Sequence, residues 1–250
     1  MGFGDAKNGL KKIVIGEILT LAAFLVIICG LPIFEMVRSG QKSADMYVTT
    51  DITSAVLYGF TVILNIIAFV LIYPGIKQAS KDEDSFKKAL IFLFLGIAAT
   101  IGRGLIKSVS IESVSAIGEK VLIIAGAIFT YYTTKCIVGG IINVANLMGD
   151  PDCEDVARGV MNFQKILCAT TGIAEVAFIA IFFLKGEISR EVYMCGTIGG
   201  VITAVAALVA YIIFIRFVKD TIGMIEYDEE QAYENSRYNP EADPDNENED

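Results

Sequence analysis

The chain has 250 residues, of which 54% are hydrophobic, and its formal net charge at pH 7 is −9. This composition is too apolar for an ordinary soluble domain, and the absence of histidine removes the commonest general base and metal ligand. The negative charge belongs to residues 226–250, which hold 11 acidic residues and one arginine. Without them, 19 basic and 18 acidic residues remain.

Six apolar stretches follow one another along the chain, and each is long enough to cross a bilayer as a helix. Such a helix needs roughly 20 apolar residues to span a hydrocarbon core of about 30 Å. We therefore predict an all-α, polytopic membrane protein with one transmembrane domain, residues 1–225. The six predicted spans are Ile13–Phe34, Ile52–Ile76, Ala89–Val109, Val121–Met148, Phe163–Leu184 and Met194–Val218.

The first span begins after three lysines, and no small-residue cleavage site follows its apolar core. This pattern predicts an uncleaved helix rather than a signal peptide. Glu17 lies only about 6 Å inside the span at 1.5 Å rise per residue. We expect its carboxylate to reach the membrane interface.

The connection between the second and third spans is highly charged. It reads GIKQASKDEDSFKKALIFLFLGI from Gly75 to Ile97. This stretch resembles a pattern of uncharacterised prokaryotic multi-pass membrane proteins: a helix end, Gly-x-Lys, a loop of small and charged residues, Phe-Lys-x-Ala and the next helix. The resemblance implies an integral membrane protein without an assigned activity, and it transfers no functional residue to this chain.

The fourth and fifth spans each carry one charge near the middle, Lys135 and Glu175. A lysine at mid-membrane costs roughly 2.5–3.5 kcal/mol on insertion scales, so an unpaired charge is disfavoured. If the loop between the spans runs from Gly149 to Asn162, both residues lie about 18 Å below the same surface. We therefore predict that they form an ion pair between antiparallel neighbouring helices.

Polar side chains share the helix faces of this pair and complete a candidate intramembrane polar site. Three interpretations remain open: a structural pair that fixes helix register, a solute or proton site that opens to the cytoplasm, or two residues that do not meet. No cofactor or metal site is indicated. The predicted site comprises Lys135, Glu175, Tyr131, Tyr132, Asn143, Asn146, Thr171 and Gln164.

Lysines recur where the odd-numbered spans begin, at Lys12, Lys88 and Lys165, with spacings of 76 and 77 residues. This spacing is typical of three helical hairpins in the same orientation, although any helix that starts in the cytoplasm favours a lysine there. Basic residues near the span ends number 11 on one side and 7 on the other. The excess predicts a cell-membrane protein with both termini in the cytoplasm.

The acidic segment 226–250 is poor in apolar residues, and we predict that it is a disordered cytoplasmic tail able to meet a basic protein partner. No motif indicates an enzyme or a nucleic-acid-binding protein, and the pattern does not predict an oligomeric state. The sequence favours a structural, regulatory or partner-binding protein of the lipid bilayer. The alternative is a small-solute or ion permease with its site around Lys135 and Glu175.

Overall fold

The computed structural model describes residues 3–30, 46–106, 112–150, 152–185 and 190–238, which are helical apart from short connections. The first helix, α1 (Gly4–Leu25), continues into a short π-helix, η1 (Val26–Gly30). The long helices that follow are α3 (Met46–Ala79), α4 (Ser85–Ile106), α5 (Glu112–Leu147), α6 (Asp152–Lys185) and α7 (Arg190–Tyr238).

Among the described residues, five helices are long and apolar enough to cross a membrane: α3, α4, α5, α6 and α7. Their outer surfaces carry large apolar side chains, such as Ile173 and Phe183, which are 71% and 68% exposed. Apolar surface on this scale is stable only against lipid. The predicted class of helical multi-pass membrane protein is therefore confirmed.

The first predicted span is a helix over its described part, but it is not among these five. Lys11, Lys12 and Glu17 lie inside α1 and interrupt its apolar surface. Residues 31–34 of that span lie outside the described residues. A membrane-crossing role for the first span therefore stays a prediction.

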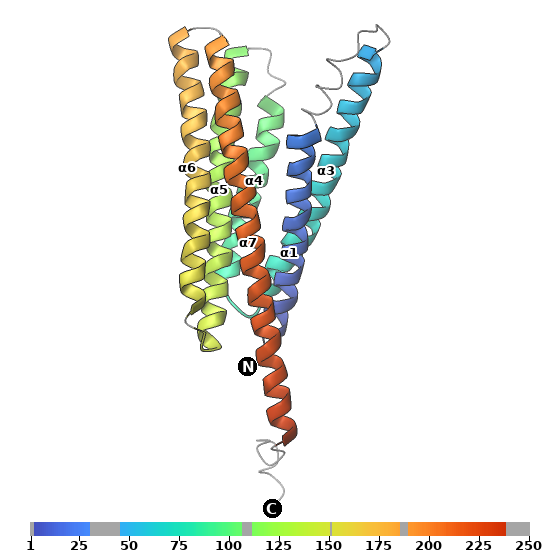
Figure 1. The fold of residues 1–250 in the computed structure, drawn as a ribbon, viewed down its shortest axis with the longest axis vertical. Coiled ribbons are helices and arrows are strands. Elements are labelled where there is room, and N and C mark those ends of the chain that lie inside the picture. Colours follow the sequence, from blue (N-terminus) through green and yellow to red (C-terminus); the bar gives the residue numbers. More distant parts are fainter. Residues whose placement is uncertain (1–2, 31–45, 107–111, 151, 186–189, 239–250) are drawn as a thin grey trace, which may run out of the picture.

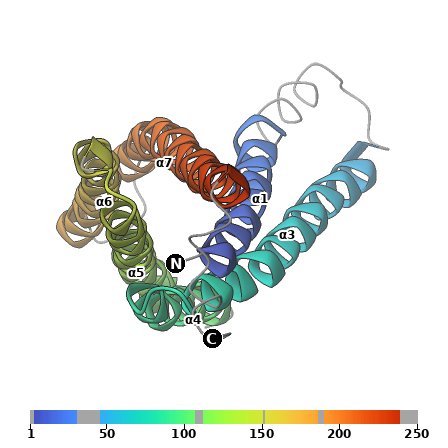
Figure 2. The ribbon, with the colours of Figure 1, turned by 90° about the horizontal axis from the view of Figure 1, so that it is seen from below.

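The helices form a ring in chain order. Each helix packs against the next one, and α7 returns to contact α1. The most extensive contacts lie within three antiparallel hairpins, α1–α3, α4–α5 and α6–α7. Figure 1 shows these hairpins side by side, and Figure 2 shows the ring from the end at which both termini lie, which we call the termini end. The hairpin architecture agrees with the spacing of the three lysines.

The apolar core is concentrated toward the termini end. Its largest fully buried side chains include Leu10, Phe86, Ile141, Val218 and Ile225, which come from four helices. These residues lie in the first turns of α1 and α4, in the last turns of α5 and in the second half of α7, and together they close one end of the ring.

Glycines allow α1 and α3 to approach very closely. A Cβ atom added to Gly9 would overlap the Gly75 carbonyl oxygen and lie 2.7 Å from the Ala79 nitrogen. One added to Gly16 would overlap Ile72 and lie 2.9 Å from the Ala68 carbonyl oxygen. Small residues on both helices thus bring the two backbones together, as in other membrane helix pairs.

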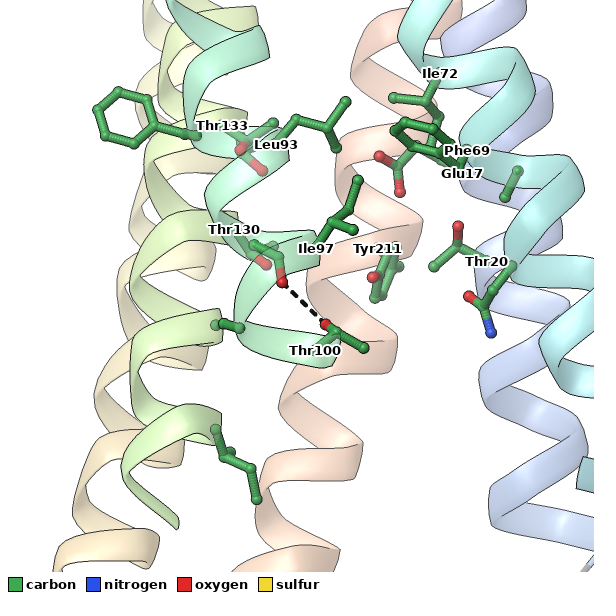
Figure 3. A pocket seen from close by; sticks show the side chains of 18 of the residues that line it. Glu17, Thr20, Phe69, Ile72, Leu93, Ile97, Thr100, Thr130, Thr133 and Tyr211 are labelled. Atoms are coloured by element: carbon green, nitrogen blue, oxygen red, sulfur yellow. Dashed lines mark hydrogen bonds between the residues drawn. The ribbon is translucent and has the colours of Figure 1, made fainter. Parts of the chain in front are cut away.

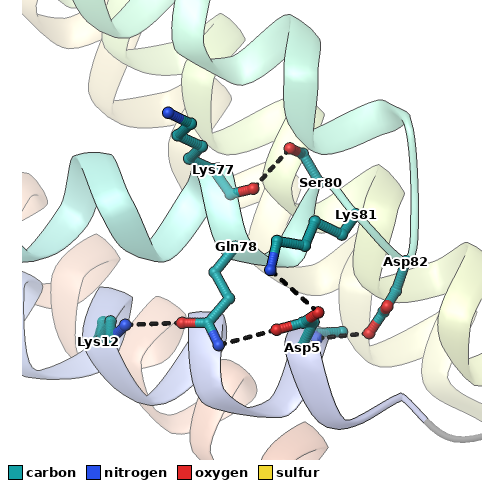
Figure 4. Close-up of polar contacts among 8 residues, drawn as sticks. Asp5, Lys12, Lys77, Gln78, Ser80, Lys81 and Asp82 are labelled. Carbon is teal, nitrogen blue, oxygen red and sulfur yellow. Dashed lines mark hydrogen bonds and ion pairs between the residues drawn. The ribbon is translucent and has the colours of Figure 1, made fainter.

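Polar contacts tie the same two helices together where they leave the apolar region (Figure 4). The Gln78 amide donates to Asp5 at 3.0 Å and accepts from Lys12 at 2.6 Å. Lys81 pairs with Asp5 at 3.3 Å, and the Ala6 N–H donates to Asp82. Hydrogen bonds from Gln78 and Lys81 lower the pKa of Asp5.

The turn between α5 and α6 is much shorter than predicted. Gly149 has φ +81°, and the Asp150 N–H donates to the Ala145 carbonyl while the Gly149 N–H donates to Asn146. These two bonds are the Schellman pattern that ends a helix at a glycine. Acidic residues, among them Asp152 and Glu154, favour the start of α6 immediately afterwards. The predicted loop Gly149–Asn162 is therefore wrong, since 152–162 is helical.

The predicted disordered tail also begins too early. Helix α7 continues to Tyr238, so residues 226–238 are helical, while 239–250 lie outside the described residues. Glu226 accepts from Lys11 at 2.6 Å, and Glu229 pairs with Lys7. The acidic charge that predicted disorder is partly neutralised by the basic start of α1, so a helix can form there.

Candidate functional site

A cavity of about 780 Å³ lies inside the ring and touches all six long helices. On α5 it extends from Ile137 to Leu122, a rise of about 22 Å. Its walls are mostly apolar, with a few polar side chains between them. Size and lining are both typical of sites that bind small organic molecules.

Glu17 of α1 brings a carboxylate to the wall of this cavity. In Figure 3, Glu17 and Thr20 point into the same space as Tyr211 of α7, and Leu93 and Ile97 of α4 lie opposite them. Glu17 is held there because the preceding residue, Gly16, packs directly on α3. The ring of helices surrounds Glu17, and the expectation that its carboxylate reaches the membrane interface stays a prediction.

Hydroxyl and amide groups add hydrogen-bonding capacity to the cavity wall. Several are already bonded to the backbone of their own helix: Thr20 to Gly16, Thr100 to Gly96, Thr133 to Phe129 and Asn65 to Thr61. Such bonds satisfy the donor and leave oxygen lone pairs for a ligand.

Arg103 is the cationic side chain on the cavity wall, near the end of the cavity farther from the termini. Its guanidinium is bonded to Glu119 of α5, with Nε and Nη2 both 2.9 Å from the same carboxylate oxygen. This pair joins α4 to α5 and largely offsets the charge of the arginine.

The termini end of the cavity is closed by the apolar core, whereas part of its wall is open. Val62 and Ile66 of α3 and Ile101 of α4 line the cavity and are 57%, 57% and 59% exposed. The predicted opening to the cytoplasm concerns the site around Lys135 and Glu175, and it stays a prediction. In this cavity the exposed apolar lining residues belong to helix surfaces that face lipid.

The predicted Lys135–Glu175 pair is wrong. Glu175 pairs with Lys120 at 3.1 Å, and the Lys120 ammonium also lies 4.5 Å from the centre of the Phe178 ring. The reason is the early start of α6. Lys135 is 12 residues from Leu147, but Glu175 is 23 residues from Asp152, a difference in depth of about 17 Å.

Lys135 is exposed on the outside of α5, where its ammonium lies 5.8 Å from the centre of the Tyr132 ring. Tyr132 stacks on Phe92 with ring centroids 5.0 Å apart, and Tyr131 contacts Tyr132 edge-on. These three predicted site residues therefore form a surface cluster between α4 and α5, away from Glu175.

The other predicted site residues are scattered. Asn143 donates to Glu83 at 3.0 Å and to Ser85 at 3.2 Å in the connection before α4. Asn146 is exposed at the end of α5, and Thr171 is buried and donates to the Leu167 carbonyl of its own helix. Gln164, which is buried, is the one predicted residue that lines the cavity.

Among the described residues, no group of three or more histidine, cysteine or acidic side chains could hold a metal ion. Comparison with known protein families, with curated proteins and with solved structures finds no match to this chain. The cavity and its side chains are therefore the basis for assigning a function.

Proposed function

We propose that the chain is an integral membrane protein of the permease class that takes up a small solute in its central cavity. The observation that carries this proposal is the cavity itself, about 780 Å³ between six helices, with one carboxylate among apolar walls. A purely structural bundle gains stability by filling such a space, because empty volume forfeits packing contacts.

The distribution of packing supports transport rather than static binding. One end of the cavity is closed by the core, and the three hairpins contact each other less than they pack internally. Hairpins that move as units could open the closed end while the other end closes, which is how permeases with repeated units give access to a central site. The excess of basic residues near the termini end supports a cell-membrane location with cytoplasmic termini.

A cavity-filling substitution tests the proposal. Gly126 of α5 lines the cavity, and an added Cβ meets no atom within 4 Å, so Gly126→Leu places a side chain in open space. Gly200→Leu of α7 is the matched control, because this glycine is exposed and also has no neighbour within 4 Å. The two changes share the same shift in intrinsic helix propensity.

The measurement is thermal unfolding of the purified protein in nanodiscs with a panel of soluble cationic, neutral and anionic compounds. A ligand at 100 times its Kd stabilises the folded state by about 2.7 kcal/mol, which raises the apparent Tm. We expect at least one class to stabilise the wild type and Gly200→Leu, but not Gly126→Leu. An equal response of the three proteins, or no response in any of them, would contradict the proposal.

A further inference from the structure

We propose that the central cavity selects amphiphilic organic cations, with the Glu17 carboxylate as the group that holds the positive charge. This inference rests on the proposed solute-binding function and names the substrate class of the same site. The inference follows from the unpaired charge of Glu17, from the aromatic and apolar side chains of the wall, and from the exposed apolar residues at the mouth of the cavity.

The negative charge of Glu17 has no cationic side chain bonded to it on the cavity wall. Arg103 is bonded to Glu119, whereas Glu17 makes no hydrogen bond or ion pair with any described residue. The nearest lysine along α1, Lys12, is bonded to Gln78 outside the cavity. A carboxylate on a mostly apolar cavity wall, with no cationic side chain bonded to it, can be paired by a cationic ligand that enters the cavity.

The surrounding rings suit an organic ammonium group. Phe69 and Tyr211 line the cavity near Glu17 (Figure 3). The Phe69 ring lies against Tyr73 and Phe94 with centroids 5.9 and 6.3 Å apart, and Tyr211 lies 6.3 Å from Phe24. Aromatic neighbours thus hold these rings in place at the wall, and ring faces attract cations.

Other ligand classes fit the cavity less well. A metal ion needs several oxygen ligands converging at 2.0–2.6 Å, and no acidic cluster of that kind occurs among the described residues. An anion would be repelled by Glu17. A highly polar neutral solute would meet the hydroxyl and amide groups of the wall, but it would also place polar groups against a wall area that is mostly apolar.

The exposed mouth indicates why the cation should also be amphiphilic. The exposed lining residues of α3 and α4, the neighbouring helices with the fewest contacts in the ring, include the apolar Val62, Ile66 and Ile101 as well as the polar Asn65, Thr100 and Arg103. Their apolar side chains face the lipid, so a molecule dissolved in the bilayer can reach the cavity through its apolar part. A cation with an apolar body meets both requirements.

Three probes with one apolar frame separate charge from shape: 4-phenylbutylamine, 4-phenylbutan-1-ol and 4-phenylbutanoate, which are cationic, neutral and anionic at pH 7. Binding is measured by calorimetry on the full chain in nanodiscs of zwitterionic lipid, with empty nanodiscs correcting for partition into the bilayer. We expect the wild type to bind the amine at least 10-fold more tightly than the alcohol, and the acid most weakly.

Variants of Glu17 identify the group responsible. Glu17→Gln should weaken amine binding at least 10-fold and change alcohol binding less than 2-fold, whereas Glu17→Asp should keep the preference for the amine. If Glu17→Gln does not fold, two measurements still test the inference. They are the preference of the wild type for the amine over the alcohol and the same preference in Glu17→Asp. Equal affinity for amine and alcohol in the wild type, or an equal loss of both in Glu17→Gln, would overturn the inference.

The Gly126→Leu variant distinguishes this failure from failure of the proposed function. If amine and alcohol bind equally and Gly126→Leu weakens both, the cavity binds solutes and only the cation selectivity is wrong. If no probe binds, or Gly126→Leu leaves binding of all three unchanged, both the selectivity and the proposed solute site are wrong.

Discussion

Single glycines decide how closely the first two helices can pack. Gly9 and Gly16 lie seven residues apart on α1, and both face small or branched residues of α3 at distances that leave no room for a methyl group. The position of Glu17 on the cavity wall depends on this contact, since Glu17 directly follows Gly16.

Gly9→Ala tests the contact. The added methyl overlaps the backbone of Gly75, and forced overpacking costs typically 1–3 kcal/mol. We expect a clear drop in the apparent Tm of the detergent-solubilised protein. Gly59→Ala on the exposed surface of α3, where no atom lies within 4 Å, should leave the Tm unchanged. Equal effects of the two changes would show that α1 and α3 do not approach at Gly9.

The Lys120–Glu175 pair is an ionic contact between α5 and α6, and its two side chains are only 21% and 17% exposed. Lys120→Met should destabilise the protein, because it strands a half-buried carboxylate, and Glu175→Leu should do the same. The double change should recover much of the loss. A double-mutant cycle on thermal stability should give a coupling above about 0.5 kcal/mol.

Lys135→Met is the control for Lys120→Met, because both lysines belong to α5. Lys135 is exposed and has no carboxylate partner among the described residues, so its loss should cost less than about 0.5 kcal/mol. Additive effects of the Lys120 and Glu175 changes, or a coupling between Lys135 and Glu175 instead, would contradict the observed register of the two helices.

At the scale of the helices, the sequence predicts which segments are helical better than it predicts where each helix ends and which residues it contacts. Apolar length is a local property, so α3 to α7 are recognisable from composition. The sequence does not reveal the early start of α6, because Gly149 ends α5 abruptly and the acidic residues after it are also typical of a loop. The resulting error of about ten residues shifts the expected partner of Glu175 by four helical turns.

The role of Glu17 could not be predicted for a different reason. Its depth along α1 was clear, but which helices surround it is decided by contacts between segments far apart in the chain, such as Tyr211 of α7. Gln164 is predicted because it shares a helix face with Glu175, and it lines the cavity although Glu175 does not. The remaining predicted residues share helix faces, but they lie on the outer surface, beside the connection before α4, or between packed helices rather than on the cavity wall.

The connection between α3 and α4 makes the termini end sensitive to acid. Hydrogen bonds from Ser85 and Asn143 lower the pKa of Glu83 from its ordinary 4.5, and contacts with Gln78 and Lys81 lower that of Asp5 from 3.8. As pH falls, these two carboxylates take up protons in the unfolded chain at a higher pH than in the folded protein. The stability that they contribute is therefore present above their ordinary pKa values and is lost as pH falls through their lowered pKa values. We expect the apparent Tm to fall below about pH 4.5, and to fall less steeply in Ser85→Ala. An unchanged acid slope in Ser85→Ala would contradict the role of this bond.

The acidic end of α7 should contribute a small, salt-dependent stability. Truncation after Asp228 removes Glu229, the partner of Lys7, whereas truncation after Tyr238 keeps both pairs with α1. Partly exposed pairs contribute roughly 0–1 kcal/mol and are screened by salt. The shorter chain should therefore have a slightly lower Tm at low salt and the same Tm at 1 M salt. A loss that persists at high salt would indicate apolar docking instead.

At the scale of the whole molecule, the ring of antiparallel helices places alternate connections at opposite ends. Reporter fusions at Lys81 and Asp155, both at the termini end, should report the cytoplasm, and a fusion at Ser113 should report the outside. If all three fusions reported the same side of the membrane, the antiparallel arrangement would be contradicted. A full reversal would keep the fold and overturn only the proposed orientation.

Helix α7 joins three regions that differ in their surroundings. It places Tyr211 on the cavity wall, Phe217 and Val218 in the core, and Glu226 and Glu229 beside the lysines of α1. At 1.5 Å per residue its 49 residues are about 72 Å long, more than twice the thickness of the hydrocarbon core. An uninterrupted helix transmits torque along its axis, so a twist applied to its aqueous end by any bound molecule also turns the cavity wall at Tyr211.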